Sequence, residues 1–278
     1  MSTQLDAASI ARISLHNPAY FSIQHSQTIH RLALLQHWKI PTNSKVLELG
    51  CGQGDCTAVL ANAVGEQGRV VAVDPAELDY GESSSFSDPA ACPVTESHLA
   101  RPAGWADYLG PADPLDYLSS LSSPSSDSSS ASERKAFDVT VLAHCLWYFA
   151  SPSLILSTFR VLKQHSKRLL LAEWSLVATH PSAQPHVLAA LTQAALECRK
   201  AKDSDSNVRT VLAPRRLTEL ALAAGWQLES ETLMQGGEGL LDGQWEVSAC
   251  LSSSFEREVE EQVSDERERA VVLASRDA

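Results

Sequence analysis

Three alternating glycines in the segment VLELGCGQGD are suited to a ligand-binding turn. Gly50, Gly52 and Gly54 directly follow the apolar run Lys45–Leu49. Residues without a Cβ atom let the backbone bend sharply and approach a ligand closely, and amide groups at the start of a following helix can bind it. Asp74 lies 24 residues beyond Gly50, near the spacing at which an acidic side chain binds a ribose diol. The pattern predicts a nucleotide-like cofactor.

The spacing of the glycines discriminates between cofactors. A dinucleotide-binding turn has the pattern G-x-G-x-x-G and accommodates a pyrophosphate, whereas this turn is G-x-G-x-G with Glu48 two residues before it. Asp55 also places a negative charge where a pyrophosphate would approach the start of a helix. The turn therefore favours a cofactor without phosphates.

Two candidate catalytic side chains follow predicted strands. His144 comes after the apolar strand 137–143, and Glu173 comes after the strand 168–172. In an open parallel sheet, ligands bind beyond the carboxyl ends of the strands. The ordinary pKa of histidine, about 6.5, suits His144 for proton removal, while Glu173 could accept a proton or bind a cationic amine. The alternatives are a hydrogen-bonded spacer at His144 and an ion pair at Glu173.

Aromatic and cysteine residues near these positions carry weaker signals. Trp147, Tyr148 and Trp174 could line an apolar acceptor pocket, although aromatic clusters also build ordinary cores. The six cysteines show neither CxxC pairs nor zinc-ligand spacing, so we predict reduced thiols and no metal site. No neighbouring His or Lys indicates an activated thiolate at Cys51 or Cys56.

Periodicity predicts the elements that position these residues. A helix over 26–39, stopped by Pro41, precedes the β-α-β unit formed by 45–49, 57–64 and 69–73. A doubly wound, mostly parallel α/β sheet of seven strands is expected, with its last two strands paired antiparallel at one edge. The further predicted strands are 105–113, 137–143, 168–172, 226–233 and 244–251, and the further helices are 152–164, 183–202 and 214–224.

We expect three regions along the chain. Residues 1–43 form an N-terminal helical cap, and 44–252 form the α/β domain. Within that domain a helix is expected to end at Ser97–Leu99, and the serine-rich run Ser119–Ser132 is too polar to bury anything and is predicted to be a surface insertion. Residues 253–278 contain Phe255, Val259 and Val263 four apart among many charges, which favours a solvated terminal helix.

The composition restricts the partners. With 278 residues and 44% hydrophobic residues, the chain can bury a substantial core. It has no apolar run of about 18 residues and no secretory signal, so a cytoplasmic protein without a membrane partner is expected. Its formal net charge of −12 would repel a phosphate backbone, so a small molecule is favoured over nucleic acid.

The segments VLELGCGQGD and VVAVDP together resemble the first motif and the acidic end of the second strand in class I S-adenosylmethionine-dependent methyltransferases. The resemblance covers residues 44–175 by motifs and extends more loosely to 251. It implies a Rossmann-like fold and S-adenosylmethionine as cofactor. The cofactor contacts that it implies come from Tyr20, Glu48, Gly50, Cys51, Gly52, Gly54, Asp74, Pro75, Asp113 and His144.

The resemblance also implies a role for each part of the site. The glycine turn would contact the methionine portion, Asp74 the ribose hydroxyls and Asp113 the adenine amino group. His144 would border both cofactor and acceptor. Many small-molecule members of this family cover the cofactor with an N-terminal helical segment. The candidates for that lid are Tyr20, Phe21 and His25, for which simple aromatic packing is the alternative.

The preferred hypothesis is methylation of a small organic molecule. A second hypothesis keeps the cofactor but uses it for a cyclisation or rearrangement, because a fold does not fix its chemistry. A third is a noncatalytic regulatory or scaffold protein that binds partners through the serine-rich run and the charged C-terminal helix. Methylation of protein or nucleic acid is disfavoured by the charge. The oligomeric state is left open.

Overall fold

The computed structural model describes residues 6–13, 18–76, 105–109, 111–121, 135–201, 204 and 206–278. The chain divides into two compact units. Unit 1 takes its described residues from Met1–Ala143, Arg160–Ala172 and Gly237–Gly239, and unit 2 from His144–Phe159, Glu173–Gly236 and Leu240–Ala278. The helical prediction at 97–99 and most of the serine-rich run lie outside the described residues.

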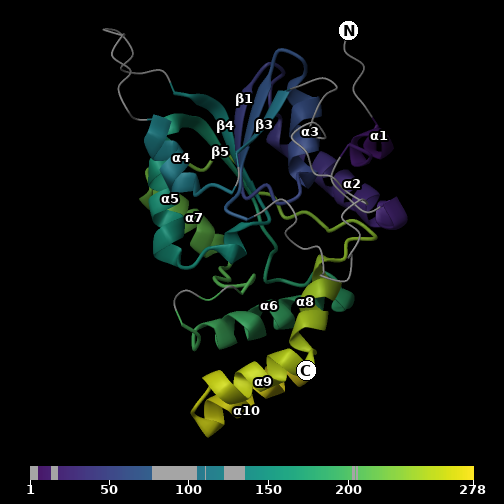
Figure 1. The fold of residues 1–278 in the computed structure, drawn as a ribbon, viewed down its shortest axis with the longest axis vertical. Coiled ribbons are helices and arrows are strands. Elements are labelled where there is room, and N and C mark those ends of the chain that lie inside the picture. Colours follow the sequence, from purple (N-terminus) through teal and green to yellow (C-terminus); the bar gives the residue numbers. More distant parts are fainter. Residues whose placement is uncertain are drawn as a thin grey trace. The chain divides into compact units, whose positions relative to one another are not determined.

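Unit 1 contains a five-stranded parallel sheet with the order β3-β2-β1-β4-β5 (Figure 1). The order reverses between β1 and β4, which makes the carboxyl end of β1 a topological switch point where ligands bind in such sheets. The central strands are rich in β-branched residues and almost wholly buried, as parallel strands covered on both faces require. The strands are β1 Lys45–Leu49, β2 Arg69–Val73, β3 Trp105–Leu109, β4 Phe137–Ala143 and β5 Ser166–Ala172.

Helix α3 of unit 1 packs on β1, β2 and β3, and α1 and α2 pack against α3. Lys39 ends α2 in a left-handed conformation, and Asp113 caps α4 through hydrogen bonds from the N–H groups of Leu115 and Asp116. The helices of unit 1 are α1 Ala7–Ala11, η1 Pro18–Tyr20, α2 Phe21–Trp38, α3 Asp55–Val64, α4 Pro114–Leu121 and the last residues of α5 Pro152–His165.

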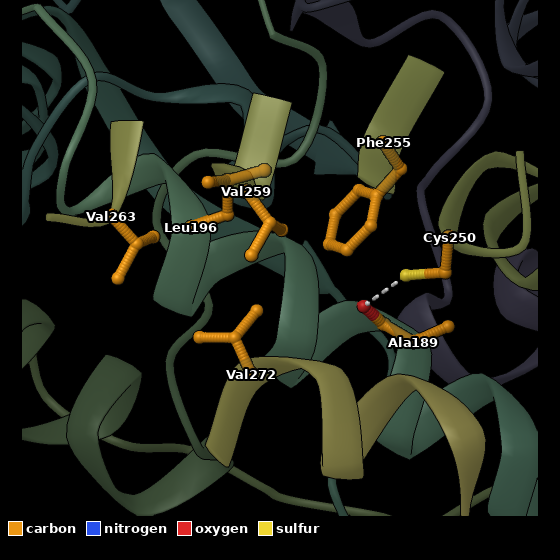
Figure 2. Packing of buried hydrophobic residues seen from close by; sticks show 7 residues of the cluster. All are labelled: Ala189, Leu196, Cys250, Phe255, Val259, Val263 and Val272. Atoms are coloured by element: carbon orange, nitrogen blue, oxygen red, sulfur yellow. Dashed lines mark hydrogen bonds between the residues drawn. The ribbon is translucent and has the colours of Figure 1, made fainter. Parts of the chain in front are cut away.

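Unit 2 is helical in its described residues. Its C-terminal helices pack on α6 through a core in which Phe255 and Val259 of α9 meet Leu196 of α6 and Val272 of α10 (Figure 2). The thiol of Cys250 donates to the carbonyl of Ala189. The elements are η2 Leu146–Tyr148, the first residues of α5, η3 Pro181–Ala183, α6 Gln184–Glu197, α7 Pro214–Ala223, α8 Asp242–Cys250, α9 Ser253–Gln262 and α10 Glu266–Asp277.

Two predicted strands are wrong, so the described sheet has five parallel strands rather than seven and no antiparallel edge pair. Residues 226–233 are irregular, and 244–251 lie largely in helix α8. Apolar residues alternate along 245–251, which mimics a strand. However, only Val247 and Cys250 of that segment join the core, three residues apart as on a helix, whereas Trp245 and Leu251 are exposed.

The predicted solvated terminal helix is also wrong. Residues 253–277 form two helices, each started by a side-chain cap: Ser252 accepts from the N–H of Phe255, and Asp265 accepts from the N–H groups of Arg267 and Glu268. The thin apolar stripe is buried because α6 supplies a partner for it. The other predicted strands and helices are found, with ends shifted by a few residues.

Candidate active site

The glycine turn follows β1 and leads directly into α3. Gly50, Gly52 and Gly54 all have positive φ, of 72°, 51° and 89°. Other residues pay a steric cost in this left-handed region, so the alternating glycines are required by backbone conformation. A Cβ atom added at Gly52 would meet nothing within 4 Å, so the space beside the turn can hold a ligand.

Asp74, directly after β2, holds this turn in place. Its Oδ2 accepts from the N–H of Gly52 at 2.7 Å, and its Oδ1 accepts from the N–H of Ala76 at 2.8 Å. The side chain is buried, with 8% of the residue exposed. The two positions that the sequence linked by spacing are therefore in direct contact. The arrangement sets a buried carboxylate beside the turn, as recognition of a ribose diol requires.

Glu48 lies inside β1 and supports the turn from below. It accepts a hydrogen bond of 2.5 Å from Thr57 of α3. Burial raises the pKa of Glu48 to about 7, although hydrogen bonds from Thr57 and Cys56 and the charge of Arg31 act in the opposite direction. Burial also raises the pKa of the Cys56 thiol, which agrees with a structural cysteine. Glu48 thus connects β1 to α3 and is fully enclosed.

Asp55 shows which cofactors the turn suits. It is the first residue of α3, and its Oδ1 accepts from Gln24 of α2 at 2.8 Å. A carboxylate at a helix start is stabilised by the helix dipole. It would repel a phosphate placed at the same helix end. The residues present therefore fit a nucleoside cofactor without phosphates.

The other predicted cofactor residues are more dispersed. Cys51 is buried in the turn, whereas Pro75 is exposed. Tyr20 is 54% exposed at the start of α2, and its predicted role as a lid stays a prediction. Asp113 is exposed and uses Oδ1 to cap α4, so its predicted adenine contact is likewise untested.

Within unit 2, the two predicted catalytic residues lie together. His144 Nδ1 is 3.7 Å from Glu173 Oε1, and both side chains are buried. The carboxylate of Glu173 also accepts from the N–H groups of Leu146 and Trp174, both at 2.9 Å. These bonds hold it in position beside the imidazole.

His144 is held in an unusual conformation. Its φ is 56°, which is rare for a residue other than glycine and is found disproportionately at functional sites. Its ring stacks on Trp174 with centroids 4.4 Å apart. The backbone, the stacking and the neighbouring carboxylate fix the imidazole. Its predicted contact with the cofactor stays a prediction.

A cavity of about 60 Å³ joins these residues in unit 2. The predicted aromatic residues Trp147, Tyr148 and Trp174 are in its wall. Trp147 also belongs to a hydrophobic core cluster, so it packs and lines the cavity at once. The lining residues are His144, Trp147, Tyr148, Glu173, Trp174, His186, Asp242, Trp245 and Glu246.

Sequence reasoning missed four of these residues: His186 of α6 and Asp242, Trp245 and Glu246 of α8. The last three lie at positions i, i+3 and i+4, which share one face of a helix. Reading 242–250 as a helix would have brought them together. The strand prediction for 244–251 hid that signal.

Among the residues that the structure describes, no helix is both long and apolar enough to cross a membrane. In the same part of the chain, no three His, Cys, Asp or Glu side chains are placed to hold a metal ion.

Comparisons with known proteins agree with the geometry of unit 1. The family model of protein-L-isoaspartate(D-aspartate) O-methyltransferase matches residues 11–84, which include the glycine turn and Asp74. A cyclopropane-fatty-acyl-phospholipid synthase-like protein from Lactobacillus casei ATCC 334 is 28% identical, with a TM-score of 0.77, over 98% of this chain and 92% of that protein. The likeness to this structure extends over nearly the whole chain. No curated protein matches the sequence.

Two other solved structures share less with the chain. A SAM-dependent methyltransferase from Aquifex aeolicus is 14% identical over 80% of this chain and 88% of its own, with a TM-score of 0.38. An arsenic(III) S-adenosylmethionine methyltransferase from Chlamydomonas reinhardtii is 19% identical over 73% of this chain and 59% of its own, with a TM-score of 0.39.

Proposed function

We propose that this chain, which is a class I S-adenosylmethionine-dependent methyltransferase, methylates a small organic molecule bound in the unit 2 cavity. The observation that carries the proposal is the buried pair of His144 and Glu173 in the wall of that cavity. A histidine beside a carboxylate is suited to accept a proton, and aromatic walls are suited to an organic molecule.

S-adenosylmethionine, when bound, supplies an electrophilic methyl group on its sulfonium sulfur. The residues of unit 1 then have a binding role. The glycine turn would hold the methionine portion through its backbone, and Asp74 would bind the ribose hydroxyls. Because Asp74 already accepts from the N–H of Gly52, it couples the two contacts. These residues position the cofactor and take no part in proton transfer.

The residues of unit 2 would orient the acceptor and remove its proton. His144 would accept that proton, and Glu173, 3.7 Å away, would stabilise the imidazolium that forms. Trp174 restrains the imidazole by stacking. An acceptor without an exchangeable proton would need the residues of unit 2 only to orient it, and not to remove a proton.

A labelled-methyl assay tests the proposal. We would incubate the protein with S-adenosylmethionine carrying a deuterated methyl group and a small-molecule cell extract, and analyse the products by mass spectrometry. We expect a small molecule that has gained one labelled methyl group. If the protein binds the cofactor and yields only an isomerised product, the reaction is a rearrangement and not methyl transfer. If no product forms at all, a noncatalytic role is favoured.

Substitutions separate a base from a spacer. His144→Gln and Glu173→Gln should each lower kcat by about 10²- to 10⁴-fold, the usual contribution of a general base, in protein that still binds S-adenosylmethionine. His180→Gln is the matched control, because His180 is an exposed histidine of the same unit that caps η3. Full turnover in His144→Gln would make His144 a spacer.

A fatty-acyl lipid is a second candidate acceptor, favoured by the likeness to the cyclopropane-fatty-acyl-phospholipid synthase-like protein from Lactobacillus casei. The same assay distinguishes it when phospholipid vesicles with unsaturated acyl chains replace the extract. Deuterium in the acyl chains would favour the lipid, whereas deuterium found only in the small molecules of the extract would favour the first candidate.

A further inference from the structure

The unit 2 cavity combines negative charge with aromatic surface. Three carboxylate residues line it, Glu173, Asp242 and Glu246, and none of its nine lining residues is Lys or Arg. Four Trp or Tyr rings complete much of the wall. Aromatic faces carry a negative quadrupole and attract cations, most strongly in Trp. Both components of the wall favour a positively charged ligand.

Helix α8 brings two like charges to this wall. Asp242 and Glu246 are one helical turn apart, a spacing at which like charges repel. Gln193 of α6 donates to Oε2 of Glu246 at 2.6 Å and orients it. Burial, with the neighbouring charge of Asp242, raises the pKa of Glu246. A bound cation would relieve the repulsion that this arrangement creates.

His186 of α6 does not offset the negative charge of the cavity wall. Burial lowers the pKa of His186, so its imidazole is neutral near pH 7 and adds no positive charge to the cavity. Its ring meets Trp147 and Trp174 edge to face, with centroids 5.8 and 5.5 Å apart. His186 therefore holds the two indole rings without competing with a cationic ligand.

Trp147, one of the lining residues, also has a buried polar atom without a partner. No residue that the structure describes accepts the hydrogen of its Nε1. A buried donor without an acceptor is costly, so an acceptor on a ligand within its reach would be favourable.

The size of the cavity limits the charged group. A single water needs roughly 10–15 Å³ by the same measure, so about 60 Å³ holds roughly four or five water-sized groups. That space suits a substituted ammonium centre and is too small for a large ligand. Trp245, half exposed at 51%, leaves the rest of the ligand a route towards solvent.

We infer that the unit 2 cavity recognises an ammonium group, and that the methyl acceptor is a small amine that binds as its ammonium ion, gives up its proton to His144 and takes the methyl group on the nitrogen lone pair that this frees. The identification of this ligand as the acceptor rests on the proposed function. The preference of the cavity for positive charge does not.

Isothermal titration tests the preference with a pair of probes. Choline carries a trimethylammonium group and a hydroxyl, and 3,3-dimethylbutan-1-ol is its neutral isostere. Both would be titrated into the full chain at pH 8 and constant ionic strength, and S-adenosylmethionine would be titrated into the same preparation. We expect choline to bind at least about tenfold more tightly than the neutral alcohol.

Two variants locate that binding. Trp245→Ala removes an exposed ring, and Glu246→Gln removes charge while keeping shape, so neither should unfold the protein. Each should weaken choline binding by about five- to tenfold and leave the alcohol unaffected. Glu260→Gln is the control, because Glu260 is an exposed acid of α9 outside the cavity.

The outcomes separate the two proposals. Equal affinity for choline and its isostere, or no choline binding in protein that binds S-adenosylmethionine, would overturn the inference. Choline affinity unchanged in both cavity variants would do the same. The expected binding pattern supports the preference of the cavity for positive charge whatever the methyl assay gives. An absence of labelled product would overturn the proposed function and, with it, the identification of the ligand as the methyl acceptor.

Discussion

The glycine turn of unit 1 and the cavity of unit 2 are built in contrasting ways. The turn is one short stretch, Gly50–Gly54, whose backbone conformation demands its residue types. The cavity gathers nine side chains from four separate segments, 144–148, 173–174, 186 and 242–246. A binding element made of backbone is encoded locally, whereas one made of side chains depends on how distant segments pack.

That contrast matches a division of labour. The predicted cofactor contacts come from the turn and from Asp74, which accepts from the N–H of Gly52. Under the proposed function, the choice of acceptor would depend on the packing of α6 and α8. Related chains can therefore keep the first feature and vary the second, because one fold supports many chemistries.

The largest effect is expected from the core that supports the cavity helices. Phe255→Ala removes a buried ring from the cluster of α6, α9 and α10 (Figure 2) and should lower the free energy of unfolding by about 3–5 kcal/mol. Val271→Ala, at a residue 66% exposed on α10, should change it by less than about 0.5 kcal/mol. Denaturant titration measures both. Equal effects would mean that the terminal helices are solvated after all.

The next effect concerns Glu48 beneath the turn. Its pKa in the folded protein is about 7, above the ordinary value of 4.5, so the folded state retains a proton that the unfolded state releases. Stability therefore falls as pH rises from about 4.5 to 7, by on the order of 3 kcal/mol. The loss should be absent in Glu48→Gln.

Urea titration at pH 5 and pH 8 provides the measurement for Glu48. The stability difference between wild type and Glu48→Gln should change with pH in favour of the variant at pH 8. Glu66→Gln, at an exposed loop position, serves as control. A difference that is the same at both values would show that Glu48 titrates like an exposed carboxyl.

Asp74 tests the turn itself. Asp74→Ala removes the acceptor of the Gly52 and Ala76 N–H groups together with the expected ribose contact. Loss of such charge-assisted hydrogen bonds should weaken S-adenosylmethionine binding by about 100-fold in isothermal titration. Asp138→Ala is the matched control, because Asp138 accepts from the N–H of Lys45 at the amino ends of the strands. Comparable losses in both variants would refute a specific ribose contact.

Sequence reasoning succeeded where local rules decide the outcome. The strand-turn-helix unit around Gly50–Gly54 follows from short-range periodicity and glycine conformation. The sequence placed His144 and Glu173 at strand ends, and the structure adds that they meet, because β4 and β5 are parallel neighbours and Ala143 pairs with Ala172 in their register. The two residues that come directly after these strands are therefore neighbours.

Sequence reasoning failed where tertiary contacts override the local pattern. Alternating apolar residues at 245–251 predicted a strand, yet Val247 and Cys250 pack on α6 as part of a helix. The single stripe of Phe255, Val259 and Val263 was too thin to predict burial without knowledge of α6. These two errors concealed the face of α8 that lines the cavity.

The smallest expected effect tests whether side-chain charge determines ligand binding in the cavity, whereas backbone conformation determines the residue types of the turn. Because burial and Asp242 raise the pKa of Glu246, this carboxylate is neutralised at a higher pH than an ordinary glutamate. Its charge should attract choline at pH 8 and be lost at a higher pH on acidification than for an ordinary glutamate, with a weakening of roughly fivefold. The other titratable groups of the wall are Glu173, Asp242, His144, His186 and Tyr148.

These neighbouring groups act in the same direction as Glu246 when the pH falls, so choline binding should weaken on acidification. Protonation of His186 would add positive charge at low pH and weaken cation binding further, and its lowered pKa places that protonation at a lower pH than for an ordinary histidine. Titration of choline at several pH values should show a smaller decline in Glu246→Gln than in wild type. A rise in choline affinity on acidification would mean that negative charge does not attract the ligand. Side-chain charge would then not determine binding in the cavity in the way that backbone conformation determines the glycine turn.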